Sequence, residues 1–420
     1  MQVTLAPEYQ DAPAGQRAQA ILRQCVHCGF CNAVCPTYQL FGDELDGPRG
    51  RIYLVKQVFE GAAPTRETQQ RLDRCLTCLS CESACPSGVR YGQLLELGRQ
   101  AVDAKVPRPD AERHMRRRLR ESLSSIWFGP AMKLGQGLRG LLPAALRERV
   151  PTPRAPGMWP RTRHARAVLL PAGCVQPSMH PNIGAATARV LDAAGIQVLR
   201  PRAGGRCCGA LKHHLGDPQG ALRQARANID AWWPHIAPKN GRQGVQAIVG
   251  NASACGLMLK DYGRLLADDP RYAARAARVS ALVRDVSELL PDIVPALRGR
   301  LKKPEGAIAW HAPCTLQHGQ RLGDAVPTHL AKLGIVLRQP QEAHLCCGAA
   351  GTYSLFQPDI ANTLRERKLE RLTEEPSPAR IVSANIGCIT HLQAGTETPV
   401  THWIELIDEL LPRQPLDNPE

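Results

Sequence analysis

Two cysteine runs with the same spacing lie in the N-terminal part of this chain. Residues 25–36 read CVHCGFCNAVCP and residues 75–86 read CLTCLSCESACP, so both follow C-x2-C-x2-C-x3-C-P. This is the spacing of two-cluster ferredoxins, in which short spacers let three thiolates of one turn converge on a [4Fe–4S] centre. Structural zinc sites use two separated ligand pairs, so two evenly spaced quartets favour iron–sulfur clusters over zinc.

In the two-cluster arrangement the fourth cysteine of each run binds the cluster of the other run. We therefore expect one centre on Cys25, Cys28, Cys31 and Cys85, and the other on Cys75, Cys78, Cys81 and Cys35. A disulfide framework is the alternative, but it requires an oxidising compartment, and we see no signal peptide at the start of the chain. Sixteen cysteines in such a chain indicate metal or redox chemistry.

The 420 residues are enough for several domains. We expect a mostly helical, ferredoxin-type domain over residues 1–102, with helical spacing at 52–59 and 72–79. A basic, amphipathic and Pro-rich connector follows over 103–165. It contains 14 Lys and Arg but only 5 Asp and Glu, within a chain of net charge +15. It includes an Arg-rich helix around 112–121 and an amphipathic stretch from 126 to 146. A G-x-G-x-x-G at 135–140 follows no strand, so we reject it as a nucleotide site.

The remainder of the chain is an internal duplication. Its cysteines recur at offsets of 140, 139 and 133 residues, which defines a first unit over 166–300 and a second over 301–420. In each unit a short apolar strand runs into the first cysteine, a helical pattern and a second strand lead to the C-C-G turn, and another strand precedes the last cysteine. We therefore predict an α+β multidomain chain, with a two-cluster domain followed by two α/β units whose cysteines lie at strand carboxyl ends.

Each duplicated unit brings four sulfurs from three loops, including a C-C-G turn. These are candidate sites for a further metal or cluster; the alternative is a vicinal disulfide or buried free thiols. His391 has a C-x2-H spacing compatible with a ligand, although a histidine near a site is more often a neighbouring core group. The candidate sulfurs are those of Cys174, Cys207, Cys208 and Cys255 in the first unit, and of Cys314, Cys346, Cys347 and Cys388 in the second.

Together the two cysteine runs, GDELDGPRGRIYL and the strings HAPCTLQHGQ, HLCCGAAGTYSL and ANIGCITHL resemble the iron–sulfur subunit of bacterial glycolate oxidase, within the wider C-C-G family. The resemblance implies flavin-binding partner subunits that oxidise glycolate to glyoxylate, while this chain relays electrons toward a quinone or other acceptor. In several relatives a C-C-G unit ends in C-x2-C and holds a non-cubane cluster. Here Met258 and His391 replace the last cysteine, so zinc, an altered cluster or no metal stay open.

The residues suggest no catalytic group, because no flavin, nicotinamide or nucleophilic motif is evident. We expect a non-catalytic subunit of an oxidoreductase complex, cytoplasmic or peripheral on the cytoplasmic face of the inner membrane. A related lactate or glycerol-3-phosphate dehydrogenase subunit and a disulfide-reductase-like catalytic protein are the alternatives. Aromatic residues make up 4% of the chain, which argues against nucleic-acid binding. The connector instead predicts a docking surface for partner subunits or an anionic membrane.

Overall fold

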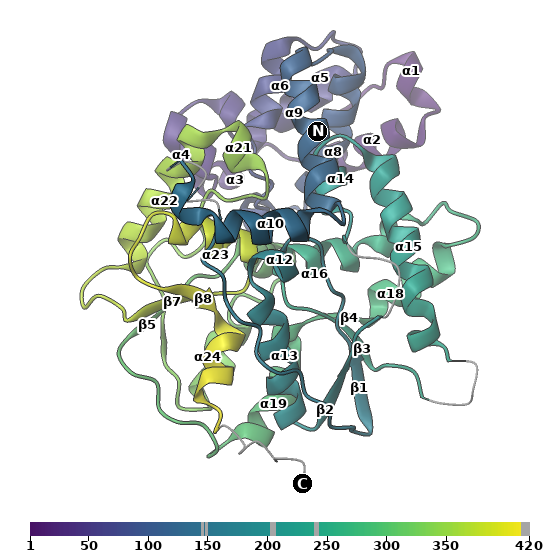
Figure 1. The fold of residues 1–420 in the computed structure, drawn as a ribbon. Coiled ribbons are helices and arrows are strands. Elements are labelled where there is room, and N and C mark those ends of the chain that lie inside the picture. The colour runs from purple at the N-terminus through teal and green to yellow at the C-terminus, as the bar shows by residue number, and fades with distance from the viewer. Residues whose placement is uncertain (144–146, 148–149, 202–206, 239–242, 413–420) are drawn as a thin grey trace.

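The computed structural model describes residues 1–143, 147, 150–201, 207–238 and 243–412. Figure 1 shows the helical N-terminal domain stacked on one end of two α/β units, with helix α10 crossing the front between them. The expected fold class, a helical cluster domain followed by two duplicated α/β units, is confirmed. The predicted domain boundaries stay predictions, and the one at residue 102 falls inside helix α8.

The N-terminal domain is built from short helices that pack around the cysteine loops. A helix over residues 52–59 was expected and lies within α5. The helix expected over 72–79 is wrong: α6 ends at Asp73, because Thr77 and Leu79 have left-handed backbone, which ends helical geometry. The helices are α1 Pro7–Gln10, α2 Pro13–Gln24, α3 Phe30–Ala33, α4 Pro36–Phe41, η1 Glu44–Asp46, α5 Pro48–Phe59, α6 Arg66–Asp73, α7 Ser80–Ser83 and α8 Tyr91–Lys105.

The connector contains two helices that lie outside the two sheets. The expected Arg-rich helix is α9, Asp110–Ser124, none of whose residues is buried. The expected amphipathic stretch forms α10, Phe128–Gly137, and a short 3₁₀ turn η2, Arg139–Leu141. Its predicted end at residues 144–146 lies outside the described residues.

The duplication is visible in the sheets, which are both parallel and share one strand order. The first sheet runs β2-β1-β3-β4 and the second β6-β5-β7-β8. Its strands are β1 Arg166–Leu169, β2 Ile196–Leu199, β3 Ala247–Gly250 and β4 Val283–Asp285; those of the second sheet are β5 Ile308–Trp310, β6 Leu337–Arg338, β7 Arg380–Ser383 and β8 Val400–His402. The strands expected before the first cysteine, the C-C-G turn and the last cysteine of each unit are present. The fourth strands, β4 and β8, are additional.

Helices cover both sheets and join the two units. One apolar core includes residues of β1, β3, β5 and β7, and α13 packs on α24, where Arg189 and Asp408 pair at 2.6 Å. The helices are α12 Gln176–Met179, α13 Pro181–Ala193, α14 Ala210–His214, α15 Pro218–Ile236, α16 Ser253–Lys260, α17 Tyr262–Leu265, α18 Ala273–Leu282, η3 Val286–Leu289, α19 Leu290–Leu297, π-helix η4 Thr315–Gly319, α20 Ala325–Ala331, α21 Tyr353–Phe356, α22 Pro358–Leu372, α23 Ile386–Gln393 and α24 Trp403–Leu410.

Candidate metal centres

The first cysteine run folds into a tight loop closed by a thiol of the second run. His27 and Gly29 have φ of 57° and 85°, and these left-handed residues turn the chain around the sulfurs. The pKa of Cys31 is raised to about 11 by burial and by neighbouring thiols, Cys25 and Cys85 among them. Cys28 is exposed. The structure thus brings together the four thiols expected at the first cluster.

The second run forms the same loop but lies deeper in the protein. Thr77 and Leu79 have φ of 55° and 63°, at the positions equivalent to His27 and Gly29. Burial raises the pKa of Cys81, and the thiols of Cys78, Cys75 and Cys35 raise it further. These are the four sulfurs expected at the second cluster. That each quartet holds an iron–sulfur cluster stays a prediction, and a set of four convergent thiols fits such a cluster.

Thiol Cys75 also receives polar contacts that the spacing alone did not predict. The backbone N–H of Thr77 donates to its Sγ at 3.4 Å, and the buried Tyr91 hydroxyl donates to the same sulfur at 3.6 Å. Donors to ligand sulfurs raise cluster potentials, because they stabilise the added negative charge of the reduced state. These contacts would therefore tune a centre held at the second run.

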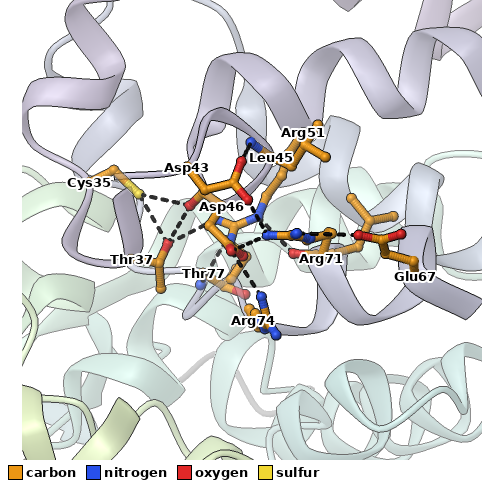
Figure 2. Close-up of polar contacts among 12 residues, drawn as sticks. Cys35, Thr37, Asp43, Leu45, Asp46, Arg51, Glu67, Arg71, Arg74 and Thr77 are labelled. Atoms are coloured by element: carbon orange, nitrogen blue, oxygen red, sulfur yellow. Dashed lines mark hydrogen bonds and ion pairs between the residues drawn. The ribbon is translucent and has the colours of Figure 1, made fainter. Parts of the chain in front are cut away.

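A buried ion network supports the second run (Figure 2). Asp46 and Arg51 are each 1% exposed and pair at 3.3 Å, while Arg71 and Arg74 reach the same carboxylate at 2.5 and 2.9 Å. Thr37 links this network to a ligand candidate: its hydroxyl donates to the Asp46 carbonyl at 2.7 Å and lies 3.3 Å from the Cys35 sulfur. Three arginines thus face one buried carboxylate beside the thiols.

Arg51 is the central cation of this network. Burial opposes its charge, yet its pKa is raised because Tyr91, Cys75, Cys35 and Asp46 favour the charged form. The sequence reasoning missed this role, although the string GDELDGPRGR contains both Asp46 and Arg51.

The first C-C-G unit gathers its four expected sulfurs at the carboxyl ends of β1 and β3. Hydrogen bonds among the thiols lower the pKa of Cys207 and raise that of Cys174, and Cys208 interacts with Cys255. Gly209 follows the pair with φ of 96°, and an added Cβ would lie 3.2 Å from a carbonyl oxygen of α15. Glycine therefore lets the turn approach that helix.

The second unit also gathers its four expected sulfurs, because Cys346 contacts Cys314 and Cys347, and Cys347 in turn contacts Cys388. Cys314 and Cys346 have their Sγ atoms 3.9 Å apart. Cys347 and Cys388 also form a compact group with His311, whose ligand atom lies within 4.8 Å of both sulfurs. The Nδ1 of His311 contacts the Ser383 hydroxyl at 2.9 Å, which leaves Nε2 as the nitrogen for a ligand role.

The histidine in this group differs from the one singled out by its spacing. His391 lines the neighbouring cavity and contacts the carbonyl of Ala361 at 3.1 Å, whereas His311 joins the sulfurs. The HAPC string carries His311 at the end of β5, so the parallel sheet, rather than a local spacing, brings it to Cys388 on α23.

A buried lysine distinguishes the second unit from the first. Lys368 on α22 is buried and donates to the Glu342 carbonyl at 2.8 Å. Burial lowers its pKa, while the neighbouring Cys347 and Cys346 raise it. In the first unit, Asn228 on α15 occupies the corresponding region and donates to the Cys207 carbonyl at 2.8 Å. The second turn thus has a buried cation close to its thiols, at the position where the first unit has an amide.

The candidate centres adjoin one another. Cys78 of the second run interacts electrostatically with Cys314 and Cys346, and all three belong to one apolar cluster. Tyr353 donates to the Arg74 carbonyl at 2.9 Å and holds the second unit against this run. A cavity of about 1450 Å³ lies between the domain and both units and is lined by Cys75, Cys174, Cys207, Cys208, Cys255, Cys314, Cys346 and Cys388.

Comparisons with known proteins agree with this division of the chain. A family model described as a 4Fe-4S dicluster domain matches residues 21–89, and one described as a cysteine-rich domain matches 168–260 and 308–393. The chain is 48% identical to the glycolate oxidase iron-sulfur subunit of Escherichia coli, over 99% of this chain and 100% of the relative. The chain belongs to the glycolate oxidase iron–sulfur subunit family.

More distant relatives match all or part of the chain. A probable glycolate oxidase iron-sulfur subunit of Bacillus subtilis is 30% identical over 90% of this chain and 89% of its own length. Lactate utilization protein A of an Exiguobacterium species is 24% identical over 56% of this chain and 94% of its own length. Within the described ranges, no helix combines the length and apolar character needed to cross a membrane.

Proposed function

We propose that this chain is the electron-transferring subunit of a glycolate oxidase complex, passing electrons from flavin-binding subunits toward a quinone or other acceptor. The observation that carries this proposal is the continuous series of thiol sites, from the exposed Cys28 through the second run to the sulfurs of the second C-C-G unit. A pair of [4Fe–4S] clusters would supply single-electron transfer, which complements a flavin that accepts two electrons and releases them singly.

The first cysteine run is the proposed entry point for electrons. Cys28 is exposed there, and the exposed side chains of Val26 and Phe30 flank it. Exposed apolar groups around a redox site suit a partner that must bring its own cofactor close. We place the flavin-binding partner on this surface.

The second run then connects the entry point with the C-C-G units. Arg51 and its network offset negative charge near Cys35 and Cys75, and Lys368 does so near Cys346 and Cys347. A cation close to the thiolates stabilises a reduced state more than an oxidised one, because reduction adds negative charge. These residues therefore favour electron movement inward from Cys28.

The metal content of the C-C-G units is a separate part of the proposal. The donors His311, Cys347 and Cys388 suit zinc or another metal that accepts nitrogen and sulfur. In the first unit Met258 packs in one apolar cluster with Cys208 and Cys255, and its thioether is a weaker ligand than a thiolate. We propose that catalysis lies in the partner subunits and that these units carry electrons or stabilise structure.

The test combines metal analysis with reconstitution of the anaerobically purified chain. We expect about eight irons and the EPR signals of two coupled cubanes, which Cys28→Ser and Cys78→Ser each disrupt. Cys255→Ser is the matched control and leaves those signals intact. About twelve irons would place a further cluster in a C-C-G unit. Far fewer than eight in intact protein would refute the two-cluster assignment.

Electron transfer is tested in the same preparation. Glycolate alone should leave the clusters oxidised, and glycolate with the flavin-binding subunits should reduce them, as followed by loss of visible absorbance. Lactate serves as the comparison substrate for the complex. Glycolate oxidation by the isolated chain would overturn the non-catalytic assignment.

A further inference from the structure

The connector exposes an unusual concentration of large apolar side chains. Half of the twelve exposed large hydrophobic residues in the described part of the chain lie between residues 115 and 141, on α9, α10, η2 and the residues that join them. We call this group the connector patch. Its members are Met115, Ile126, Trp127, Leu134, Leu138 and Leu141. An apolar concentration of this kind on a protein surface marks an interaction site more often than chance.

Helix α10 is apolar on two faces, and one of them is already used. Phe128 and Met132 line the cavity between the domains and so face the interior. Trp127, the N-cap residue, and Leu134 lie about two turns apart on the other face and are 72% and 65% exposed. A helix that is apolar on its outer face as well as its inner face requires a second apolar contact.

Exposed basic groups lie in the same segment as the connector patch. Arg117 and Arg118 on α9 are exposed, as are Lys133 on α10 and Arg147 beyond it. No ion pair joins these four groups to an acid within the described residues. Exposed cations in the same segment as exposed Trp and Leu side chains fit an anionic surface that also accepts apolar side chains.

We propose that the connector patch binds the surface of an anionic lipid bilayer, with α10 lying in the plane of the headgroups. Trp127 would sit at the headgroup level, the leucines would enter the acyl boundary, and the cations would contact lipid phosphates. A bilayer satisfies both the apolar face and the surplus charge, which is why we favour it over a partner protein. The inference rests on the proposed function, because it names the surface that brings the relay to a lipid-soluble acceptor.

Vesicle co-sedimentation of the anaerobically purified full chain tests the inference. The probes are phosphatidylcholine vesicles with and without phosphatidylglycerol. We expect binding that requires phosphatidylglycerol, weakens with salt and falls at least tenfold in Trp127→Ser/Leu134→Ser. Arg117→Gln/Arg118→Gln should reduce the salt dependence. Val336→Ser, which changes a side chain 77% exposed on the second unit, is the matched control and should bind as the unchanged protein does.

Tryptophan fluorescence locates the contact. All six tryptophans lie in the described residues; Trp127 is exposed, and the other five are buried or half-buried. Brominated lipids should therefore quench the unchanged protein and leave Trp127→Phe largely unquenched, although that variant retains an apolar side chain. Visible absorbance and circular dichroism establish that each variant is folded.

Two outcomes would overturn the inference. The first is that the patch variants and Val336→Ser bind vesicles equally well. The second is that the unchanged protein binds no vesicles but associates with itself or with a partner protein, and that the patch variants abolish this association. Failure of the relay is a different result. It would appear as clusters that glycolate and the flavin-binding subunits cannot reduce in detergent-free solution, with vesicle binding retained.

Discussion

Removing the charge of the Asp46 carboxylate tests how the second cysteine run is held in place. Asp46 is 1% exposed and contacts Arg51, Arg71 and Arg74 at 3.3, 2.5 and 2.9 Å. Asp46→Asn retains the shape of the side chain and removes its charge, so Arg51 becomes a buried cation beside two others. Breaking a buried ion pair from one side costs about 3–5 kcal/mol.

The effect should be measured as a rate, since loss of clusters makes unfolding irreversible. If about 3 kcal/mol of this cost appears in the unfolding barrier, Asp46→Asn unfolds roughly 100-fold faster, because each ~1.4 kcal/mol is tenfold. The assay follows far-UV circular dichroism and visible absorbance after anaerobic dilution into guanidinium chloride. Both signals should disappear together, because the network links the fold of the domain to the Cys35 loop.

Glu67→Gln is the matched control. Its side chain is 67% exposed and pairs with Arg71 at 3.2 Å, and exposed pairs of this kind contribute about 0–1 kcal/mol. The rate should therefore change by less than about fivefold. A rate for Asp46→Asn within that same range would refute the reasoning. Asp46→Asn/Arg51→Met should recover part of the loss, because it also removes the unpaired cation.

Three further predictions concern the second unit and its metal site. Gly348→Ala places a Cβ 2.3 Å from a carbonyl oxygen of α22 at a φ of 88°, so thermal unfolding should show a loss of stability of more than about 2 kcal/mol in the second unit. The loss should exceed that of Gly209→Ala, where the corresponding distance is 3.2 Å. Burial lowers the pKa of His402 to about 3, so the folded state favours the neutral ring. The stabilisation from the neutral ring is fully present above the unfolded pKa, near 6.5, and falls by about 1.4 kcal/mol for each pH unit below that value. His402→Asn keeps an acceptor for the first turn of α24 and should flatten this part of the urea-unfolding profile, and an unchanged slope would contradict the assignment. Lys368→Met should weaken metal binding by the second unit about tenfold in a chelator competition. Lys332→Met is the control and should bind the metal as the unchanged protein does.

Much of the candidate site follows from local spacing. The C-x2-C-x2-C-x3-C-P runs predict which cysteines group together, because a two-residue spacer limits where the next sulfur can lie. The C-C-G turns and the strands before Cys174 and Cys314 are likewise visible in the sequence, since strand length and glycine position are local properties. The repeat of cysteine offsets also predicted two similar α/β units, which share one strand order.

Short or interrupted elements could not be predicted in the same way. β4 and β8 are three residues long, and neither has enough alternation to distinguish it from a helix end. The helix expected through residues 72–79 failed for the opposite reason. Its apolar spacing is helical, but the loop around Cys75 and Cys78 requires left-handed backbone at Thr77 and Leu79.

The sequence by itself determined the number of units and predicted an iron–sulfur domain and the cysteines that group together, because these depend on spacing along the chain. Only the tertiary structure decided which groups meet across it: Cys78 with Cys314 and Cys346, His311 with Cys388, and Arg51 with Asp46 in a buried position. Such contacts join residues far apart in the sequence or depend on complete exclusion of water. Parallel strands and domain packing create both conditions, and neither has a signature in local sequence.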